Sequence, residues 1–219
     1  MYYNSIYSQL FNFIPRYRFE KIVKKSGGDR YCKHFTAWKQ FLTLLFAQIS
    51  GKDSLREIEN ALLANHKRLY HLGMEAVAKS TLSEAMNRRN PEIFKALFEE
   101  LLDRVMAVAP KHKFKFKNPL YAIDSTTIDL CLSRYNWAYY RKHVMSQIRV
   151  AMIHYLLIAY LKFLHGFKLG MTELTNRIRD TLMQNQSLLE VLSLERKILE
   201  KPPNWNLPVQ EELFSPLLL

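Results

Sequence analysis

The sequence predicts a mainly α-helical protein whose helices are interrupted by one or two β-strands. Apolar residues recur every three or four positions along most of the 219 residues, and only six glycines and eight prolines interrupt this pattern. The exception is the middle of the chain, where residues 111–117 alternate lysine with phenylalanine and residues 120–132 are rich in Ile, Thr and Tyr. The expected parts are a helical N-terminal domain (1–110), a short strand-bearing segment (111–142), C-terminal helices (147–201) and a loose tail (202–219).

The N-terminal helices are marked by their start and stop residues. The first helical segment is predicted over residues 5–25 and is broken at Pro15, because proline has no N–H to donate. A loop at 26–29 follows. Thr36 can then cap a helix that Gly51 ends. That helix is apolar on almost every side, so we expect it at the centre of the domain.

Two short helices, predicted at 54–64 and 80–89, form a candidate DNA-binding unit. Ser54 and Glu57 have the spacing of a capping box, and Ser80 is expected to open the second helix. The connection between the helices contains glycine, as in a helix-turn-helix, but it is longer than the usual three or four residues.

The remaining helices follow the same periodicity. A long helix is predicted to start at Asn90-Pro91 and to end before Pro110. Beyond the strands, one helix is expected over 147–165 and another over about 172–200, where Pro202-Pro203 stops it.

The charge is uneven along the chain. The formal net charge is +12. Residues 1–119 hold 21 Lys and Arg against 11 Asp and Glu, which leaves only +2 for residues 120–219. A basic N-terminal half is expected in a protein that meets a polyanion, so the charge favours a nucleic-acid partner over a merely basic surface.

The helix at 80–89 is the predicted reader of DNA. Its inward face carries Leu82, Ala85 and Met86. On its polar side, phosphates would be held by Lys79, Arg88 and Arg89, and base edges would be faced by Thr81, Ser83 and Asn87. An ordinary amphipathic helix with a solvated charged face predicts the same pattern, and both interpretations stay open. The lysines of 111–117 could also follow a phosphate backbone, although a lysine-protected edge strand is the favoured interpretation.

Several classes of protein are not indicated. Cys32 and Cys131 lie far apart without zinc-ligand spacing, so we expect neither a disulfide framework nor structural zinc. No Lys or Arg precedes Arg16, which argues against a signal peptide. The apolar run 150–164 is short for a membrane span, and His154 and Lys162 interrupt it, so it predicts a buried helix. The expected location is cytoplasmic.

Asp124 is the candidate metal ligand. It interrupts an apolar strand, where a carboxylate is costly unless it is hydrogen-bonded, paired or bound to a metal. Metal-dependent phosphoryl transfer requires at least two convergent carboxylates. Asp129 lies five residues further on and therefore points to the opposite face of a regular strand. A structural aspartate satisfied by Ser125 and Thr126 remains the alternative.

Several motifs together resemble bacterial insertion-sequence transposases of the insertion-sequence-four type. The segments that carry this resemblance are 35–42, 46–58, 69–73, 80–82 and 120–133. The last of these looks like the first strand of an RNase H-like catalytic domain. The resemblance implies that Asp124 is the first acid of a DDE triad that uses Mg²⁺ to cut and rejoin DNA. It also implies a helical N-terminal domain that binds the terminal inverted repeats of the element.

The chain departs from this family after Lys142. The second Asp and the Glu of the triad are not found, and residues 147–157 resemble the C-terminal helix that follows the catalytic Glu. An internal deletion joined near 143–147 accounts for this pattern. The later acids match no triad position: Glu173, Glu190 and Glu195.

Three functional hypotheses follow. The first is a transposase that is catalytically defective in this chain. The second is a DNA-binding remnant that regulates full-length transposase; its expected assembly is either a dimer or a complex with full-length transposase. The third is an unrelated helical regulator in which Asp124 is structural. Double-stranded DNA is the expected partner of the first two.

Overall fold

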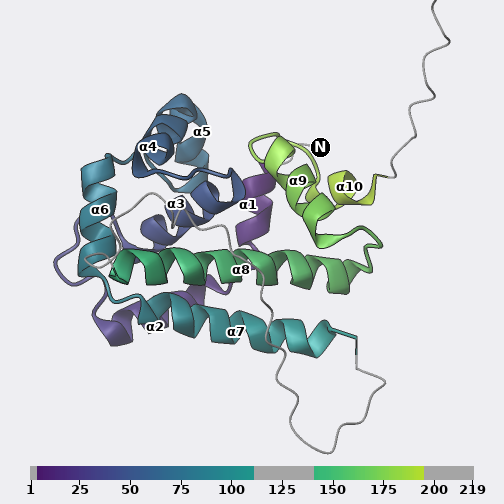
Figure 1. Ribbon diagram of the computed structural model, residues 1–219, viewed down its shortest axis with the longest axis horizontal. Coiled ribbons are helices and arrows are strands. Elements are labelled where there is room, and N and C mark those ends of the chain that lie inside the picture. The colour runs from purple at the N-terminus through teal and green to yellow at the C-terminus, as the bar shows by residue number, and fades with distance from the viewer. Residues whose placement is uncertain (1–3, 111–140, 195–219) are drawn as a thin grey trace, which may run out of the picture.

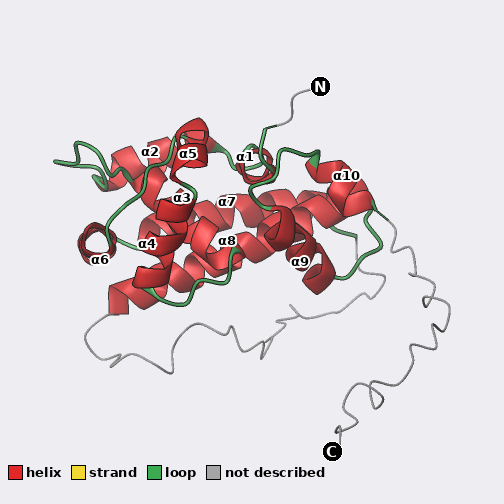
Figure 2. Ribbon diagram, turned by 90° about the horizontal axis from the view of Figure 1, so that it is seen from above, coloured by secondary structure: helices red, strands yellow, loops and turns green. Residues whose placement is uncertain are grey.

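The computed structural model describes residues 4–110 and 141–194, which are helical with no strand in these two ranges (Figures 1 and 2). The elements are α1 (Ile6–Phe11), α2 (Arg16–Ser26), α3 (Ala37–Ile49), α4 (Leu55–Ala64), α5 (His66–Leu69), the 3-10 helix η1 (Tyr70–Leu72), α6 (Lys79–Arg88), α7 (Glu92–Val108), α8 (Arg141–His165), α9 (Met171–Thr181) and α10 (Leu188–Ser193). The mainly helical class is therefore confirmed. The predicted strands, Asp124, Cys131 and the tail 202–219 lie outside the described residues.

The predicted helix boundaries in the N-terminal half are confirmed where local chemistry sets them. The first segment breaks around Pro15, between α1 and α2. Thr36 Oγ1 accepts a hydrogen bond from Lys39 N at 3.3 Å and caps α3. Ser54 Oγ accepts from Glu57 N at 3.2 Å, and Glu57 Oε2 accepts in return from the N–H of the preceding Asp53 at 3.1 Å. These two bonds form a capping box in which the returning bond reaches Asp53, the residue before the N-cap Ser54.

The core is built around α3 and α8. Almost every side chain of α3 is buried, as its apolar sequence predicted. α8 packs against α3 and lies along α7, and the two long helices run side by side (Figures 1 and 2). Phe41 of α3 contacts the rings of Phe19, Trp38 and Phe94, which join α2 and α7 to this core.

The N-terminal and C-terminal helices share one hydrophobic core, which extends from Ile6 in α1 to Leu192 in α10. The backbone N–H groups of Ile6 and Tyr7 donate to the carbonyls of Gln184 and Leu182 at 3.0 and 2.9 Å. The expected N-terminal domain and C-terminal helices are therefore packed as one unit in the described structure.

Helix α8 has a composition that a membrane span shares. Its segment Lys142–His165 is long and apolar enough to cross a bilayer, with a mean hydropathy of 1.4 in its most apolar window. However, 56% of that window is buried inside the structure. Val150, Ile153 and Leu157 are almost completely covered. Packing against α3 and α7 accounts for the apolar composition, as the sequence analysis expected.

Two helix predictions in the C-terminal half need correction. The helix expected at 147–165 begins at Arg141, so residues 141 and 142, assigned to the strand-bearing segment, are helical. The single helix expected over about 172–200 is two helices, α9 and α10, within the described part. Ser187 starts the second helix, because its hydroxyl accepts a hydrogen bond from Glu190 N at 3.4 Å. Leucines continue at helical spacing through this turn, so the sequence pattern did not indicate the break.

Candidate nucleic-acid interface

The two helices of the candidate DNA-binding unit, α4 and α6, pack against each other. Their connection is longer than a helix-turn-helix turn and contains α5 and η1. Leu69, Leu72, Met74 and Val77 of this connection are buried, so it is anchored to the core along its length. Gly73 ends η1 with a φ of +64°, a conformation that glycine adopts without strain.

Helix α6 separates its apolar and polar residues as predicted. Leu82, Ala85 and Met86 are buried. Four of the predicted DNA-contacting residues are exposed, namely Lys79, Thr81, Asn87 and Arg88. Ser80, expected to open the helix, lies inside its first turn, because α6 begins one residue earlier and no side chain of the described residues caps it. The exposed face also carries Glu84, an acid that opposes contact with a phosphate backbone.

Ser83 lies one helical turn from Lys79 and from Asn87, on the same face of α6, but it is less exposed than either. It is half-buried, and its backbone hydrogen-bonds the ring of His143 in α8. Burial lowers the pKa of His143, and this hydrogen bond opposes the decrease. Ser83 therefore sits where α6 meets α8, which leaves it less accessible than Thr81 or Asn87 for reading bases.

The prediction that Arg89 holds a phosphate needs correction, because its side chain is only 2% exposed. Its Nη1 donates to Gln40 Oε1 at 2.8 Å and its Nε to Gly28 O at 3.2 Å. Its Nη2 bonds the Asp29 carboxylate and Cys32 Sγ, each at 3.2 Å, and also the carbonyl of Phe35. The donors of Arg89 are thus taken up inside the protein. Sequence periodicity placed Arg89 on the polar side, but tertiary contacts bury it.

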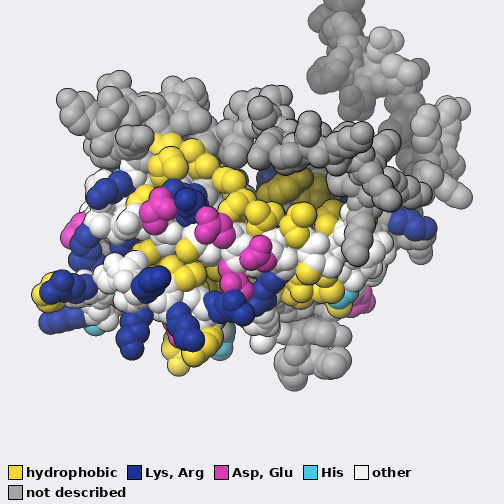
Figure 3. All heavy atoms as spheres, turned by 90° about the horizontal axis from the view of Figure 1, so that it is seen from below, with side chains coloured by type: hydrophobic (Ala, Val, Ile, Leu, Met, Phe, Trp, Pro, Cys, Tyr) yellow, Lys and Arg dark blue, Asp and Glu magenta, His cyan; other side chains and the backbone are white. Residues whose placement is uncertain are grey.

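Arg89 holds the segment 28–35, here called the basic loop, against the end of α6. The loop exposes Arg30, Tyr31, Lys33 and His34. Next to it, Arg88 of α6 donates to Cys32 Sγ. Arg88, an exposed cation of α6, therefore lies beside the exposed cations of the loop. Figure 3 shows lysine and arginine side chains gathered at this end of the molecule.

The basic loop was not singled out from the sequence. It has no periodicity, and its contact with α6 spans more than fifty residues of sequence. The signal that could have found it is the run Arg30-Tyr31-Cys32-Lys33-His34 directly after two glycines, which combines exposed cations with an aromatic ring.

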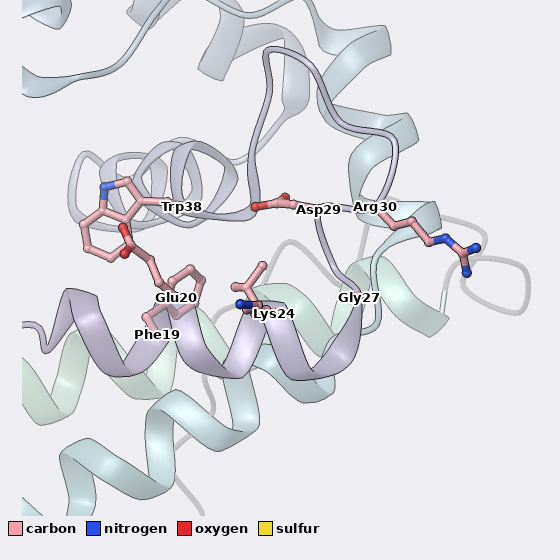
Figure 4. Close-up of a pocket in the computed structure, with 8 residues that line it drawn as sticks. Phe19, Glu20, Lys24, Gly27, Asp29, Arg30 and Trp38 are labelled. Carbon is pink, nitrogen blue, oxygen red and sulfur yellow. The ribbon is translucent and has the colours of Figure 1, made fainter.

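A cavity of about 430 Å³ adjoins the basic loop. Phe19 and Trp38 form its apolar wall, with Glu20 beside them, whereas Arg30 extends away from it (Figure 4). Glu20 already pairs with Arg16 at 2.9 Å, and the guanidinium of Arg16 lies 5.5 Å from the Trp38 ring centre. The second acid of the rim, Asp29, is held by Arg89. The cavity thus has an aromatic wall and acids that are already paired.

The predicted metal site does not fall within the described structure. Asp124 lies outside it, and no three His, Cys, Asp or Glu side chains of the described residues are grouped to hold a metal ion. The Mg²⁺ site expected at Asp124 therefore stays a prediction.

Comparison with known proteins gives one match, to a family model that covers part of the chain. Residues 3–75 match a domain of unknown function (DUF4372). The match covers about a third of the chain and extends from α1 to just beyond η1, so it includes the basic loop and α4 and ends before α6. No curated protein and no solved structure shows a significant match.

Proposed function

We propose that this protein binds double-stranded DNA, as a transposase-related protein that grips the ends of an insertion sequence without cutting them. The observation that carries the proposal is the exposed polar face of α6, on which Lys79, Thr81, Asn87 and Arg88 lie while the opposite face packs on the core. The matched domain at 3–75 is associated with transposase-like proteins, which supports the same reading.

The four exposed residues have complementary chemistry for a DNA groove. Lys79 and Arg88 stand at the two ends of α6, where each can bind a phosphate. Thr81 and Asn87 lie between them. An asparagine side chain can pair with the N6 and N7 atoms of adenine, and a threonine can meet a base edge or the thymine methyl group. Arg89 takes no part in binding and holds the basic loop in place.

Binding without cleavage is the form of the proposal that the sequence favours. Transposases of the resembled family need three acids, and only Asp124 has a counterpart in this chain. A chain that grips the ends but lacks two acids would compete with full-length transposase for the same DNA, so a regulatory role follows from the missing residues.

A binding and nicking assay tests the proposal. The purified chain is mixed with duplexes from the two ends of the DNA element that encodes it, or with an unrelated duplex, in Mg²⁺ or Mn²⁺. We expect a mobility shift with the end duplexes and no nicked product. Nicking that Asp124→Ala abolishes would overturn the binding-only function and restore the transposase function. Failure to bind any duplex at low salt would overturn DNA binding altogether.

A further inference from the structure

The basic loop is held by several hydrogen bonds although Arg30, Tyr31, Lys33 and His34 are exposed. Arg89 bonds four of its residues, at Gly28, Asp29, Cys32 and Phe35. Asp29 Oδ1 also accepts from Ala37 N at 2.6 Å, which ties the loop to the start of α3. Inside the loop, the N–H of Cys32 donates to the carbonyl of Asp29 at 3.0 Å. These bonds fix the loop on its inner side, while its outward-facing side chains are exposed to solvent.

Tyr31 stands at the tip of this loop in an unfavourable conformation. Its φ is +60°, and among the described residues it is the one non-glycine residue with a positive φ. A left-handed backbone costs an ordinary L residue free energy, and such strain gathers at functional positions. The side chain is 84% exposed, so burial of the ring does not offset that cost. A glycine here would be more stable, which indicates that the ring serves binding.

The surroundings of the ring are cationic. The guanidinium of Arg30 lies 5.1 Å from the centre of the Tyr31 ring, and Lys33 is two residues away and exposed. The one acid of the loop, Asp29, is neutralised by Arg89. Arg88 of α6 reaches the adjacent Cys32. An exposed aromatic ring beside exposed cations matches a nucleotide, which offers a flat base to stack and a phosphate to bind.

We infer that the basic loop is a second nucleic-acid contact, in which Tyr31 stacks on an unpaired base and Arg30 and Lys33 bind the phosphates beside it. This inference rests on the proposed function, since α6 would hold the adjoining duplex. The loop would therefore direct the protein to DNA that carries an unpaired base next to a double helix, such as a bulge or a strand end. A rigid loop suits this task because little conformational entropy is lost on binding.

The test compares two probes, a short fully paired duplex and the same duplex with one extrahelical 2-aminopurine. We expect the protein to bind the bulged probe at least about fivefold more tightly than the paired duplex, because stacking of one base on an aromatic ring contributes at least this much affinity. We also expect binding to quench the 2-aminopurine fluorescence. Tyr31→Gly should lose both the preference and the quenching while its affinity for the paired duplex changes less than about twofold. Tyr31→Phe should retain both.

A matched control lies on α2. Tyr17 is also exposed, at 69%, and Lys21 lies 4.6 Å from its ring centre, but Tyr17 is not on the basic loop. Tyr17→Ala should leave the preference intact. Folding does not confound the comparison, because glycine adopts the φ of Tyr31 without strain and the melting temperature of Tyr31→Gly should equal or exceed that of the parent.

The outcomes separate the two proposals. If the protein binds both probes equally and Tyr31→Gly changes nothing, DNA binding stands and the stacking role is overturned. If Tyr17→Ala abolishes the preference as fully as Tyr31→Gly, the role of the basic loop is likewise overturned. If neither probe is bound at low salt, the proposed function is overturned and the inference with it.

Discussion

The guanidinium of Arg89, at the end of α6, lies 3.2 Å from the carboxylate of Asp29 in the basic loop, and the Arg89 side chain is 98% covered. This pair joins two surfaces that are distant in sequence and both cationic. It explains why α6 and the basic loop present their exposed residues together. The pair is therefore the structural basis of the interface proposed here.

Replacing Arg89 should destabilise the protein strongly. Arg89→Met removes the partner of Asp29 and leaves the carbonyls of Gly28 and Phe35 without their donor. Arg89 is buried but the Asp29 side chain is 33% exposed, so the expected loss is about 2 kcal/mol or more, less than for a fully buried charge pair. Urea denaturation should show this loss, and Arg89→Lys should recover only part of it because an ammonium cannot reproduce the planar fork. Arg88→Met, one residue away and exposed, is the control and should cost less than about 0.5 kcal/mol. Equal losses for the two residues would contradict the structural role of Arg89.

Removing the acid from the exposed face of α6 should strengthen DNA binding. Glu84 lies among the proposed contacts and would repel phosphates. We expect Glu84→Gln to raise the affinity for duplex DNA by roughly two- to fivefold at low salt, with a smaller gain at high salt. Fluorescence anisotropy measures this change. Glu190→Gln in α10, at the other end of the molecule (Figure 1), should leave the affinity unchanged. No gain from Glu84→Gln would indicate that this face of α6 does not meet DNA.

Stability should depend on His154 at mildly acidic pH. Its Nε2 is buried without a hydrogen-bond partner among the described residues. Burial, aided by the positive charge of Arg179, lowers the pKa of His154 to about 4. Between pH 6.5 and 4, His154 is therefore protonated in the unfolded chain but stays neutral in the folded chain. The free energy of unfolding is therefore unaffected by His154 above pH 6.5, and it decreases as the pH falls toward 4, by up to about 3 kcal/mol.

Paired denaturation curves test this pH dependence. The free energy of unfolding should fall less steeply between pH 7 and 5 in His154→Leu than in the parent, so the variant gains relative stability in acid. His165→Gln, at the exposed end of the same helix, should follow the parent curve. Parallel curves for the parent and His154→Leu would show that His154 titrates normally.

Local chemistry made most of the N-terminal helices predictable. The side-chain hydroxyls of Thr36 and Ser54 cap their own helices, and the break at Pro15 follows from its missing N–H. These helix boundaries could therefore be predicted without knowing any long-range contact. The single helix expected over about 172–200 failed, because apolar residues continue at helical spacing through the turn before Ser187. The packing of α1 on that turn, through Ile6 and Tyr7, stabilises the break and is invisible in sequence.

The candidate interface was predictable only in part. The exposure of Lys79, Thr81, Asn87 and Arg88 follows from the amphipathic pattern of α6. Arg89 has the same side-chain chemistry as Arg88, and its burial depends on a loop some sixty residues earlier. The periodicity of the sequence does not indicate such a long-range contact. The metal role of Asp124 stays a prediction from the resemblance.

The most direct test of the central claim is the salt dependence of duplex binding by the parent and by the double variant Lys79→Ala/Arg88→Gln. Each phosphate contact that is lost should reduce the slope of log affinity against log salt by about 1. We predict that the slope decreases by about 2 while the melting temperature stays close to that of the parent. Lys168→Ala, in the turn between α8 and α9, should leave the slope unchanged. An unchanged slope in the double variant would contradict DNA binding through α6.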